Sequence, residues 1–181
     1  MTEIINYLFE AYANYSAFEI VLECLAFGFG IISVIYAKKE NILVYPTGIT
    51  CTLITMYFMF SERLIGHMMV NLFYTLMSIY GWWNWSRKEN DVVKVKISKF
   101  GFKDLPKASL IFFFIVFISY FLHDYFNTDL GAYASLDIFT SGIFVTAMWL
   151  MANKKLENWV LWIIGNVITI PLYFGSDKII L

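Results

Sequence analysis

The sequence predicts an all-α integral membrane protein with a single membrane domain, and three observations support this fold class. Hydrophobic residues form 60% of the 181-residue chain, charged residues form only 15%, and the mean hydropathy is +0.66. This is more apolar surface than one soluble core could bury. Apolar stretches of helix length recur along the chain, and a short phrase occurs twice, each time directly before such a stretch.

Six apolar stretches are long enough to cross a membrane, and we expect helices because a helix satisfies its own backbone hydrogen bonds in lipid. They cover residues 18–37, 43–60, 64–85, 107–123, 136–152 and 158–174. The one long connection between spans, Arg87–Lys103, lies between the third and fourth spans and is polar and basic. We therefore predict a first three-helix repeat over about 17–86, a linker and fourth helix over about 87–133, and an incomplete second repeat over about 134–181.

The repeated phrase predicts a repeated helical hairpin. The first copy, Lys38-Lys39-Glu40-Asn41, precedes ILVYPTGITCTLITMYF. The second copy, Lys154-Lys155-Leu156-Glu157-Asn158, precedes WVLWIIGNVITIPLYF. Aligning the two asparagines, which are 117 residues apart, also pairs Tyr45 with Trp162, Gly48 with Gly165 and Thr52 with Thr169. A repeated membrane hairpin with its charges on the same side is typical of transporters built from parallel repeats.

The basic residues predict the orientation in the membrane. Eleven of the thirteen Lys and Arg residues lie in Lys38-Lys39, Arg87–Lys107 and Lys154-Lys155. Alternation of the six spans places these three segments on one face, whereas Arg63 and Lys178 fall on the other. The positive-inside rule therefore predicts that the three segments are cytoplasmic and that residues 1–15 lie outside.

Several motifs resemble the PnuC family of bacterial vitamin transporters, and the resemblance covers the chain from about Glu19 onward. They are Glu40-Asn41, Tyr45-Pro46-x-Gly48, the run SIYGWWNW at 78–85, and KLENWxxW with IPLY between 155 and 173. The resemblance implies two parallel three-helix bundles joined by a linker helix, similar to a full-length SWEET sugar transporter. It also implies facilitated diffusion of nicotinamide riboside across the bacterial inner membrane, with phosphorylation by a cytoplasmic kinase that traps the substrate for NAD synthesis.

The chain departs from the pattern of this family at two places. The family usually has a seventh span, so the last helix of the second repeat is expected to be missing or truncated here, since the sequence stops at Leu181. Carriers of nicotinamide riboside often have an acidic residue at the position of Asn166. A carrier of another vitamin such as thiamine, and a membrane scaffold or sensor that does not transport, therefore remain alternatives.

The sixth span offers the best candidates for a ligand site. Trp159, Trp162, Asn166, Thr169 and Tyr173 recur at helical spacing and form one polar and aromatic stripe. A nucleoside needs an aromatic platform and polar groups for its sugar, and an indole face attracts a cation such as the riboside of nicotinamide. The alternative is that the amide joins two helices and that Trp159 anchors the chain at the membrane interface.

Two other spans could supply the remaining walls of this site. The third span contributes Asn71 and Tyr74, and the second contributes Tyr45 and Thr52. A threonine in a membrane helix often bonds its own backbone instead of a ligand. Trp82, Trp83 and Trp85 lie just before Arg87, and we assign these three residues to the aromatic belt at the membrane interface.

Other classes of function receive no support from the sequence. No ATP-binding loop, catalytic pair or cluster with metal-ligand spacing is present, so we expect neither an enzyme nor a bound cofactor. A net charge of −1 argues against a nucleic-acid partner. The expected partners are a vitamin or nucleoside and the lipid bilayer, with a homo-oligomer left open.

Overall fold

The computed structural model describes residues 15–61, 65–89, 92–93, 95–125 and 134–175. Each predicted span overlaps one helix, and these helices are α2 (Ala17–Lys38), α3 (Val44–Ser61), α4 (Ile65–Ser86), α5 (Leu105–Tyr125), α6 (Ala134–Ala152) and α7 (Asn158–Gly175). The predicted all-helical fold is confirmed for this part of the chain. The linker adds a feature that we did not predict, an antiparallel pair of two-residue strands, β1 (Lys88–Glu89) and β2 (Val92–Val93).

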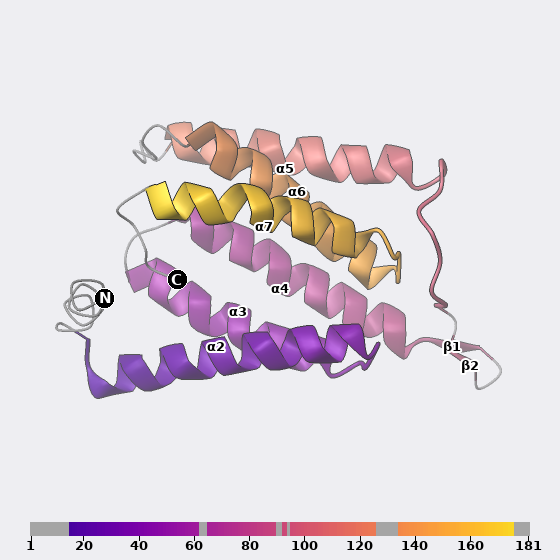
Figure 1. Cartoon of the computed structure of the whole chain (residues 1–181), viewed down its shortest axis with the longest axis horizontal. Helices are drawn as coiled ribbons and strands as arrows, with labels where there is room; N and C mark the ends of the chain where they lie inside the picture. Colours follow the sequence, from indigo (N-terminus) through magenta and orange to yellow (C-terminus); the bar gives the residue numbers. More distant parts are fainter. Residues whose placement is uncertain (1–14, 62–64, 90–91, 94, 126–133, 176–181) are drawn as a thin grey trace.

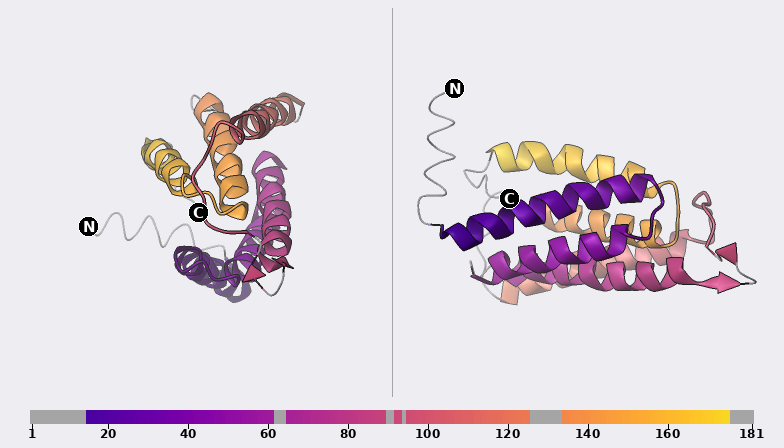
Figure 2. Two further views of the ribbon diagram at one scale, coloured as in Figure 1. Left: turned by 90° about the vertical axis from the view of Figure 1, so that its right-hand side faces the viewer. Right: turned by 90° about the horizontal axis from the view of Figure 1, so that it is seen from below.

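The helices form a bundle in which α3 lies between α2 and α4, α4 packs against α6, and α6 contacts both α5 and α7. Figures 1 and 2 show α2 at one edge of the bundle and α5 at the opposite edge. Helices α2 and α6 run in one direction, and α3 and α7 return in the other (Figure 1). The connections after α2, α4 and α6 consequently lie at one end of the bundle, which we call the turn end.

The surface of the bundle is that of a membrane-embedded protein. Among the described residues, three segments are long and apolar enough to cross a membrane, namely Ala17–Lys38, Leu105–Leu122 and Ser135–Ala152. Length and composition thus support three of the six predicted spans, whereas α3, α4 and α7 do not meet the same standard. Only 6% of the first segment is buried, and large apolar side chains such as Phe18 and Phe27 are exposed on it. Since water would penalise such a continuous apolar surface, lipid is the solvent that fits it.

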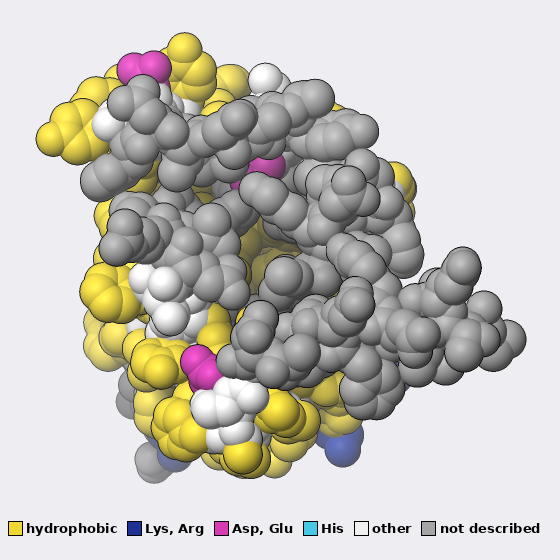
Figure 3. Space-filling view, turned by 90° about the vertical axis from the view of Figure 1, so that its left-hand side faces the viewer, with side chains coloured by type: hydrophobic (Ala, Val, Ile, Leu, Met, Phe, Trp, Pro, Cys, Tyr) yellow, Lys and Arg dark blue, Asp and Glu magenta, His cyan; other side chains and the backbone are white. Residues whose placement is uncertain are grey.

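Charge is segregated between the two ends of the bundle. Every described Lys and Arg lies at the turn end, within 38–39, 87–107 and 154–155. Figure 3 views the opposite end, where hydrophobic side chains are visible inside a central hollow and the described charged side chains nearest the viewer are acidic. Arg63, Lys178 and residues 1–14, which the predicted orientation also uses, lie outside the described residues.

Helix α2 begins and ends with recognisable capping interactions. At its start, Ser16 Oγ accepts a hydrogen bond from Glu19 N (3.2 Å), and Glu19 Oε2 accepts one from Ser16 N (2.8 Å). This capping box satisfies backbone donors that the first turn of a helix leaves unpaired. At its end, Glu40 adopts a left-handed conformation with φ 52°, which reverses the chain toward α3.

The turns after α2 and α6 share one backbone conformation. In the first, Glu40 N donates to Ala37 O (3.1 Å) and Asn41 N donates to Tyr36 O (2.9 Å), the two bonds of a Schellman motif. The second turn has the same two bonds 114 residues later, with Lys154 also at φ 52°. These bonds run from Lys154 N to Met151 O and from Lys155 N to Leu150 O, both at 2.9 Å.

The backbone offset of 114 differs from the offset of 117 at which the repeated phrase aligns. The phrase begins inside the last turn of α2, because Lys38 is its final residue, whereas Lys154 lies beyond the end of α6 at Ala152. The two alignments therefore differ by three residues, which is about one helical turn. By backbone position, Tyr45 corresponds to Trp159, Gly48 to Trp162, and Thr52 to Asn166.

The linker before α5 packs onto the second turn. Ser98 N donates to Lys154 O (3.0 Å), and Leu156 N donates to Ser98 O (3.1 Å). Lys155 Nζ forms an ion pair with Asp104 Oδ2 at 2.8 Å. The hydrogen bond from Lys155, together with one from Gly101 N, lowers the pKa of the Asp104 carboxyl below its ordinary value.

A buried aromatic cluster near the turn end connects α3 and α4 with the end of α6. Tyr45 and Trp85 pack edge to face with ring centroids 5.1 Å apart, and Gly81 leaves room for the tyrosine ring, which an added Cβ would overlap. Trp85 Nε1 donates to Ala152 O at the end of α6 (3.2 Å). The assignment of Trp85 to the interfacial belt is therefore wrong, because its ring is buried between helices, whereas Trp82 and Trp83 are exposed.

Candidate functional site

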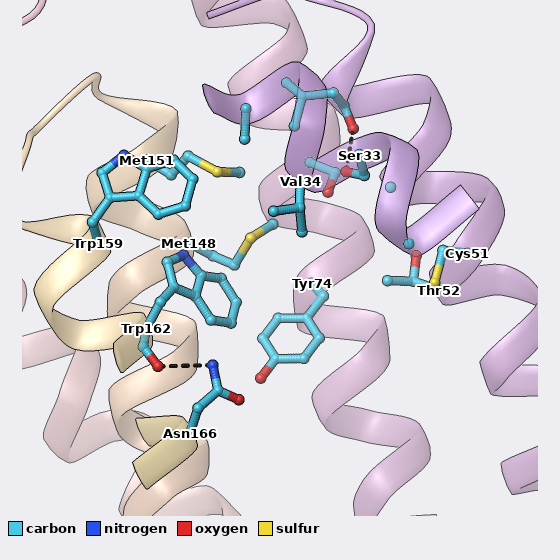
Figure 4. Close-up of a pocket in the computed structure, with 15 residues that line it drawn as sticks. Ser33, Val34, Cys51, Thr52, Tyr74, Met148, Met151, Trp159, Trp162 and Asn166 are labelled. Atoms are coloured by element: carbon cyan, nitrogen blue, oxygen red, sulfur yellow. Dashed lines mark hydrogen bonds between the residues drawn. The ribbon is translucent and has the colours of Figure 1, made fainter. Parts of the chain in front are cut away.

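A cavity of about 300 Å³ lies between α2, α3 and α4 on one side and α6 and α7 on the other (Figure 4). We call it the central cavity. Its volume is within the range of small-molecule sites in proteins. It is lined by Gly30, Ser33, Val34, Ala37, Val44, Gly48, Cys51, Thr52, Tyr74, Ser78, Met148, Met151, Trp159, Trp162 and Asn166.

Helix α7 forms the aromatic wall of the central cavity. Trp159, Trp162 and Asn166 are spaced i, i+3 and i+7, so they share one face of the helix. Trp162 stacks on Phe144 of α6 with ring centroids 5.4 Å apart and an interplanar angle of 28°. An added Cβ at Gly165 would overlap the Phe144 ring, so the glycine permits the packing that supports Trp162 from behind.

The tyrosine of α4 faces this wall. The ring centroids of Tyr74 and Trp162 are 6.5 Å apart and the rings are tilted by 47°. Figure 4 shows both rings and the side chain of Asn166 directed toward the same space. Asn166 Nδ2 donates to Trp162 O of its own helix (2.9 Å), which fixes the amide so that its oxygen is available as an acceptor for a ligand.

The wall formed by α2 and α3 consists of small side chains. Gly48, Cys51 and Thr52 of α3 line the cavity together with Ser33 of α2. Ser33 Oγ donates to Val44 O (3.0 Å), and the hydroxyls of Thr52 and Thr75 are 2.8 Å apart. These polar groups are thus engaged within the protein, and this wall gives the cavity its width.

The structure brings five of the eight predicted site residues together and leaves three elsewhere. Those that line the central cavity are Trp159, Trp162, Asn166, Tyr74 and Thr52. Tyr45 is buried against Trp85, Thr169 Oγ1 is buried without a hydrogen-bond partner among the described residues, and Asn71 is not among the lining residues. The side chain of Tyr173 lies outside the described part of the chain.

Several lining residues were not candidates from the sequence. Ser33 and Cys51 are small polar residues within apolar spans, and this signal could have identified them. Met148 and Met151 of α6 gave no such signal, because a methionine in an apolar helix has the same appearance whether it faces a ligand or a neighbour.

The central cavity is electrically neutral. None of the described residues that line it is Asp, Glu, Lys, Arg or His. Among the described residues, no group of three or more His, Cys, Asp or Glu side chains could hold a metal ion. The arrangement can stack a planar ring and supply amide and hydroxyl contacts, and it can stabilise a positive charge through its aromatic faces.

Comparison with known proteins agrees with this architecture. The nicotinamide riboside transporter PnuC of Escherichia coli (strain K12) is 26% identical, over 80% of this chain and 70% of the relative. A protein of the same name from Neisseria mucosa is 29% identical, over 80% of this chain and 56% of the relative. The fold is similar to a crystal structure of the vitamin B3 transporter PnuC, with a TM-score of 0.61, 20% identity, and coverage of 95% of this chain and 85% of that one.

A family model named "Nicotinamide mononucleotide transporter" matches residues 20–181, which is most of the chain. The proteins similar in sequence and in structure are named as transporters and not as enzymes. The apolar helices, the neutral aromatic cavity and this match lead to one conclusion. The chain belongs to the nicotinamide mononucleotide transporter family of membrane transporters.

Proposed function

We propose that this protein takes up nicotinamide riboside by facilitated diffusion through the central cavity. The observation that carries the proposal is the pairing of Trp162 and Tyr74 across a neutral cavity, with the amide of Asn166 beside them. The pyridinium ring of the riboside is planar and cationic, and aromatic faces attract such a ring by about 1–2 kcal/mol when water is excluded. The relatives named as nicotinamide riboside transporters support this substrate.

The lining of the cavity favours the riboside over the mononucleotide. A phosphate group carries about −1.5 to −2 charges at pH 7, and proteins bind it through Arg, Lys or helix N-termini. The described lining residues include no basic side chain. Transfer of an uncompensated phosphate into this cavity would be strongly unfavourable.

The described residues that line the cavity include no carboxylate that would compensate the positive charge of the substrate. The aromatic faces of Trp159 and Trp162 stabilise the positive charge of the substrate more weakly and less specifically than an ion pair would. Weak binding of this kind allows the substrate to leave the cavity as well as to enter it. Thiamine is also an aromatic cation, so it is the natural competitor in a binding experiment.

The directions of the helices support a parallel repeat. Helices α2 and α3 in one half, and α6 and α7 in the other, run in matching directions and share the same Schellman turn. We propose repeats over about 17–86 and 134–181, with a linker and fourth helix over about 87–133, as in the SWEET-like arrangement. Relative movement of the two halves would then expose the cavity alternately to each side.

The charge segregation supports an orientation in the bacterial inner membrane with the turn end in the cytoplasm and residues 1–15 outside. In this arrangement the substrate would leave the cavity at the turn end. Phosphorylation by a cytoplasmic kinase would then retain it in the cell for NAD synthesis.

Binding and uptake by the purified protein test the proposed function. Calorimetry should detect nicotinamide riboside and no binding of nicotinamide mononucleotide at the same concentration. Vesicles containing the protein should equilibrate labelled riboside without concentrating it when a proton or sodium gradient is applied. Tight binding of the mononucleotide, or of thiamine in preference to the riboside, would overturn the substrate assignment, and binding without flux would indicate a sensor.

A further inference from the structure

A second cavity of about 160 Å³ adjoins the central cavity on the side of the turn end, and we call it the vestibule. The two cavities share the lining residues Ala37, Met151 and Trp159. Unlike the central cavity, the vestibule is lined by charged residues, including Glu40 and Lys154. A ligand that passes from the central cavity to the turn end along these shared residues must therefore cross a charged region.

The ammonium of Lys154 occupies a position suited to an organic cation. Its Nζ lies 3.6 Å from Glu40 Oε2 and 4.5 Å from the centroid of the Trp85 ring. A carboxylate combined with an indole face is a common arrangement for binding a positively charged ligand. The side chain of Lys154 is only 12% exposed, so the lysine fills this position instead of extending into solvent.

The backbone indicates that these two side chains have a role beyond the turns themselves. Glu40 and Lys154 both have φ 52° and both occupy the position that ends a helix in a left-handed conformation. Glycine is the usual residue at this position, because a Cβ makes the conformation unfavourable. The two equivalent turns thus each hold a disfavoured residue, and the side chains meet across the boundary between the two halves.

We propose that Glu40 and Trp85 form a transit site for organic cations, and that the Lys154 ammonium plugs it until a cationic ligand leaving the central cavity displaces it. The chemical class of the ligand rests on the proposed function. Exchange of one cation for another leaves the Glu40 carboxylate compensated throughout, so the step creates no unpaired charge. Glu40 is 46% exposed, and a partly solvated ion pair of this kind is weak enough to exchange.

The neighbouring residues are consistent with this role for Lys154 alone. Lys38 and Lys155 also line the vestibule, but among the described residues the ion pair with Glu40 is formed by Lys154. The Nζ of Lys155 is held instead by Asp104 at 2.8 Å. Among the described residues that line the two cavities, Glu40 supplies the one carboxylate. It is thus the first full negative charge that a cation moving along these two cavities toward the turn end encounters.

A native cysteine provides a reporter for the plug. Cys51 lines the central cavity, and Cys24 is the other cysteine in the sequence. In a Cys24→Ser background, the rate at which water-soluble thiosulfonate reagents label Cys51 from the turn end reports access through the vestibule. The experiment uses Lys154→Met and Glu40→Gln, which both retain a Cβ at the left-handed position and so leave the backbone preference unchanged.

Comparison of a cationic with an anionic reagent tests the site itself. The parent should be labelled slowly by both reagents. Lys154→Met should be labelled faster, with about a tenfold preference for the cationic reagent, because Glu40 then loses its ion-pair partner. The double variant Lys154→Met/Glu40→Gln should also be labelled fast but without this preference. Labelling of Lys154→Met at the parent rate, or a cation preference that survives Glu40→Gln, would overturn the proposal.

A small pyridinium probe separates this proposal from the proposed function. In Lys154→Met, the N-methylnicotinamide cation should slow labelling of Cys51, whereas neutral nicotinamide should not. The double variant should lose this protection. Because no vitamin transport is measured, these results hold even if calorimetry shows that nicotinamide riboside is not the substrate, and equal protection by the neutral compound would contradict a cation site.

Discussion

Helices α3 and α7 leave equivalent turns in the same direction, yet they present different side chains to the cavity between them. The positions that correspond by backbone hydrogen bonding are Gly48 and Trp162, and Thr52 and Asn166. All four line the central cavity. The α3 wall therefore provides space and the α7 wall provides aromatic and amide groups, so two similar backbone segments line one cavity asymmetrically.

The largest expected effect comes from Trp162. We expect Trp162→Ala to weaken ligand binding by about 1–3 kcal/mol, as measured for the stacking of bases on aromatic residues. This corresponds to roughly 5- to 150-fold in Kd by calorimetry. Trp83→Ala is the matched control, because Trp83 is exposed outside the cavity and should leave the Kd unchanged. Equal losses in both variants would place the site away from the α7 wall.

The support behind Trp162 gives the next largest effect. In Gly165→Ala the new methyl group would overlap the Phe144 ring on which Trp162 stacks, so both rings must shift. Overpacking of this kind costs typically about 1–3 kcal/mol of stability. We expect a lower thermal midpoint and a weaker Kd than in the parent.

Two further variants sharpen this prediction. Gly28→Ala is the control, because no atom lies within 4 Å of its new Cβ. Adding Phe144→Leu to Gly165→Ala should recover part of the affinity by removing the overlap. If Gly165→Ala bound the ligand like the parent, Phe144 would not be positioning Trp162.

The polar contacts of the two walls give a smaller difference. Asn166→Leu removes the free amide oxygen and should weaken binding by about 0.5–1.5 kcal/mol, the typical net value of one hydrogen bond. Thr52→Val on the opposite wall should change the Kd less, because the Thr52 hydroxyl already lies 2.8 Å from that of Thr75. A larger loss in Thr52→Val would reverse the assignment of contacts and space to the two walls.

The smallest expected effect is a pH-dependent change in thermal stability, which comes from the ion pair at the second turn. The pKa of Asp104 is lowered by Lys155, so the ionised carboxylate stabilises the fold above the ordinary value of 3.8. This contribution is lost as the pH falls through the lowered pKa, below 3.8. A partly exposed pair at the protein surface contributes about 0.2–1 kcal/mol. The thermal midpoint of Asp104→Asn should therefore be slightly lower than that of the parent at pH 7 and should converge with it below pH 3.8.

The control for this prediction comes from the first turn. Glu40→Gln removes a carboxylate that pairs with Lys154 at the longer distance of 3.6 Å. Its effect on the thermal midpoint at pH 7 should be no larger than that of Asp104→Asn. A larger effect would show that the first turn, and not the second, depends more on its ion pair.

Hydropathy was sufficient to predict the helices, because a membrane helix must be apolar over its full length. The predicted span 18–37 and the observed Ala17–Lys38 differ by one residue at each end. The capping of α2 by Ser16 and Glu19 sharpens its start, and the left-handed residue Glu40 fixes its end. The linker was predicted only as a polar segment, because its anchoring to Lys154 depends on residues that are distant in sequence.

The site was partly predictable for a similar reason. The stripe on α7 is visible in the sequence because Trp159, Trp162 and Asn166 interrupt an aliphatic helix. Phe144 could not be predicted, since the apolar residues of α6 are not confined to one face and 56% of its candidate span is buried. Tyr45 is a residue type that often contacts ligands, but its ring packs into the helix interface, in the space that Gly81 leaves free. The binding role of the α7 residues stays a prediction until a ligand is measured.

The left-handed residues Glu40 and Lys154 have a consequence for attempts to engineer this protein. A directed-evolution screen that selects for heat resistance should favour glycine at both positions, because glycine adopts this conformation without penalty. Each such replacement would also remove one partner of the contact between the halves. Thermostable variants enriched in this way would be easier to purify and would leak, and their stability would be a misleading guide to their value as transporters.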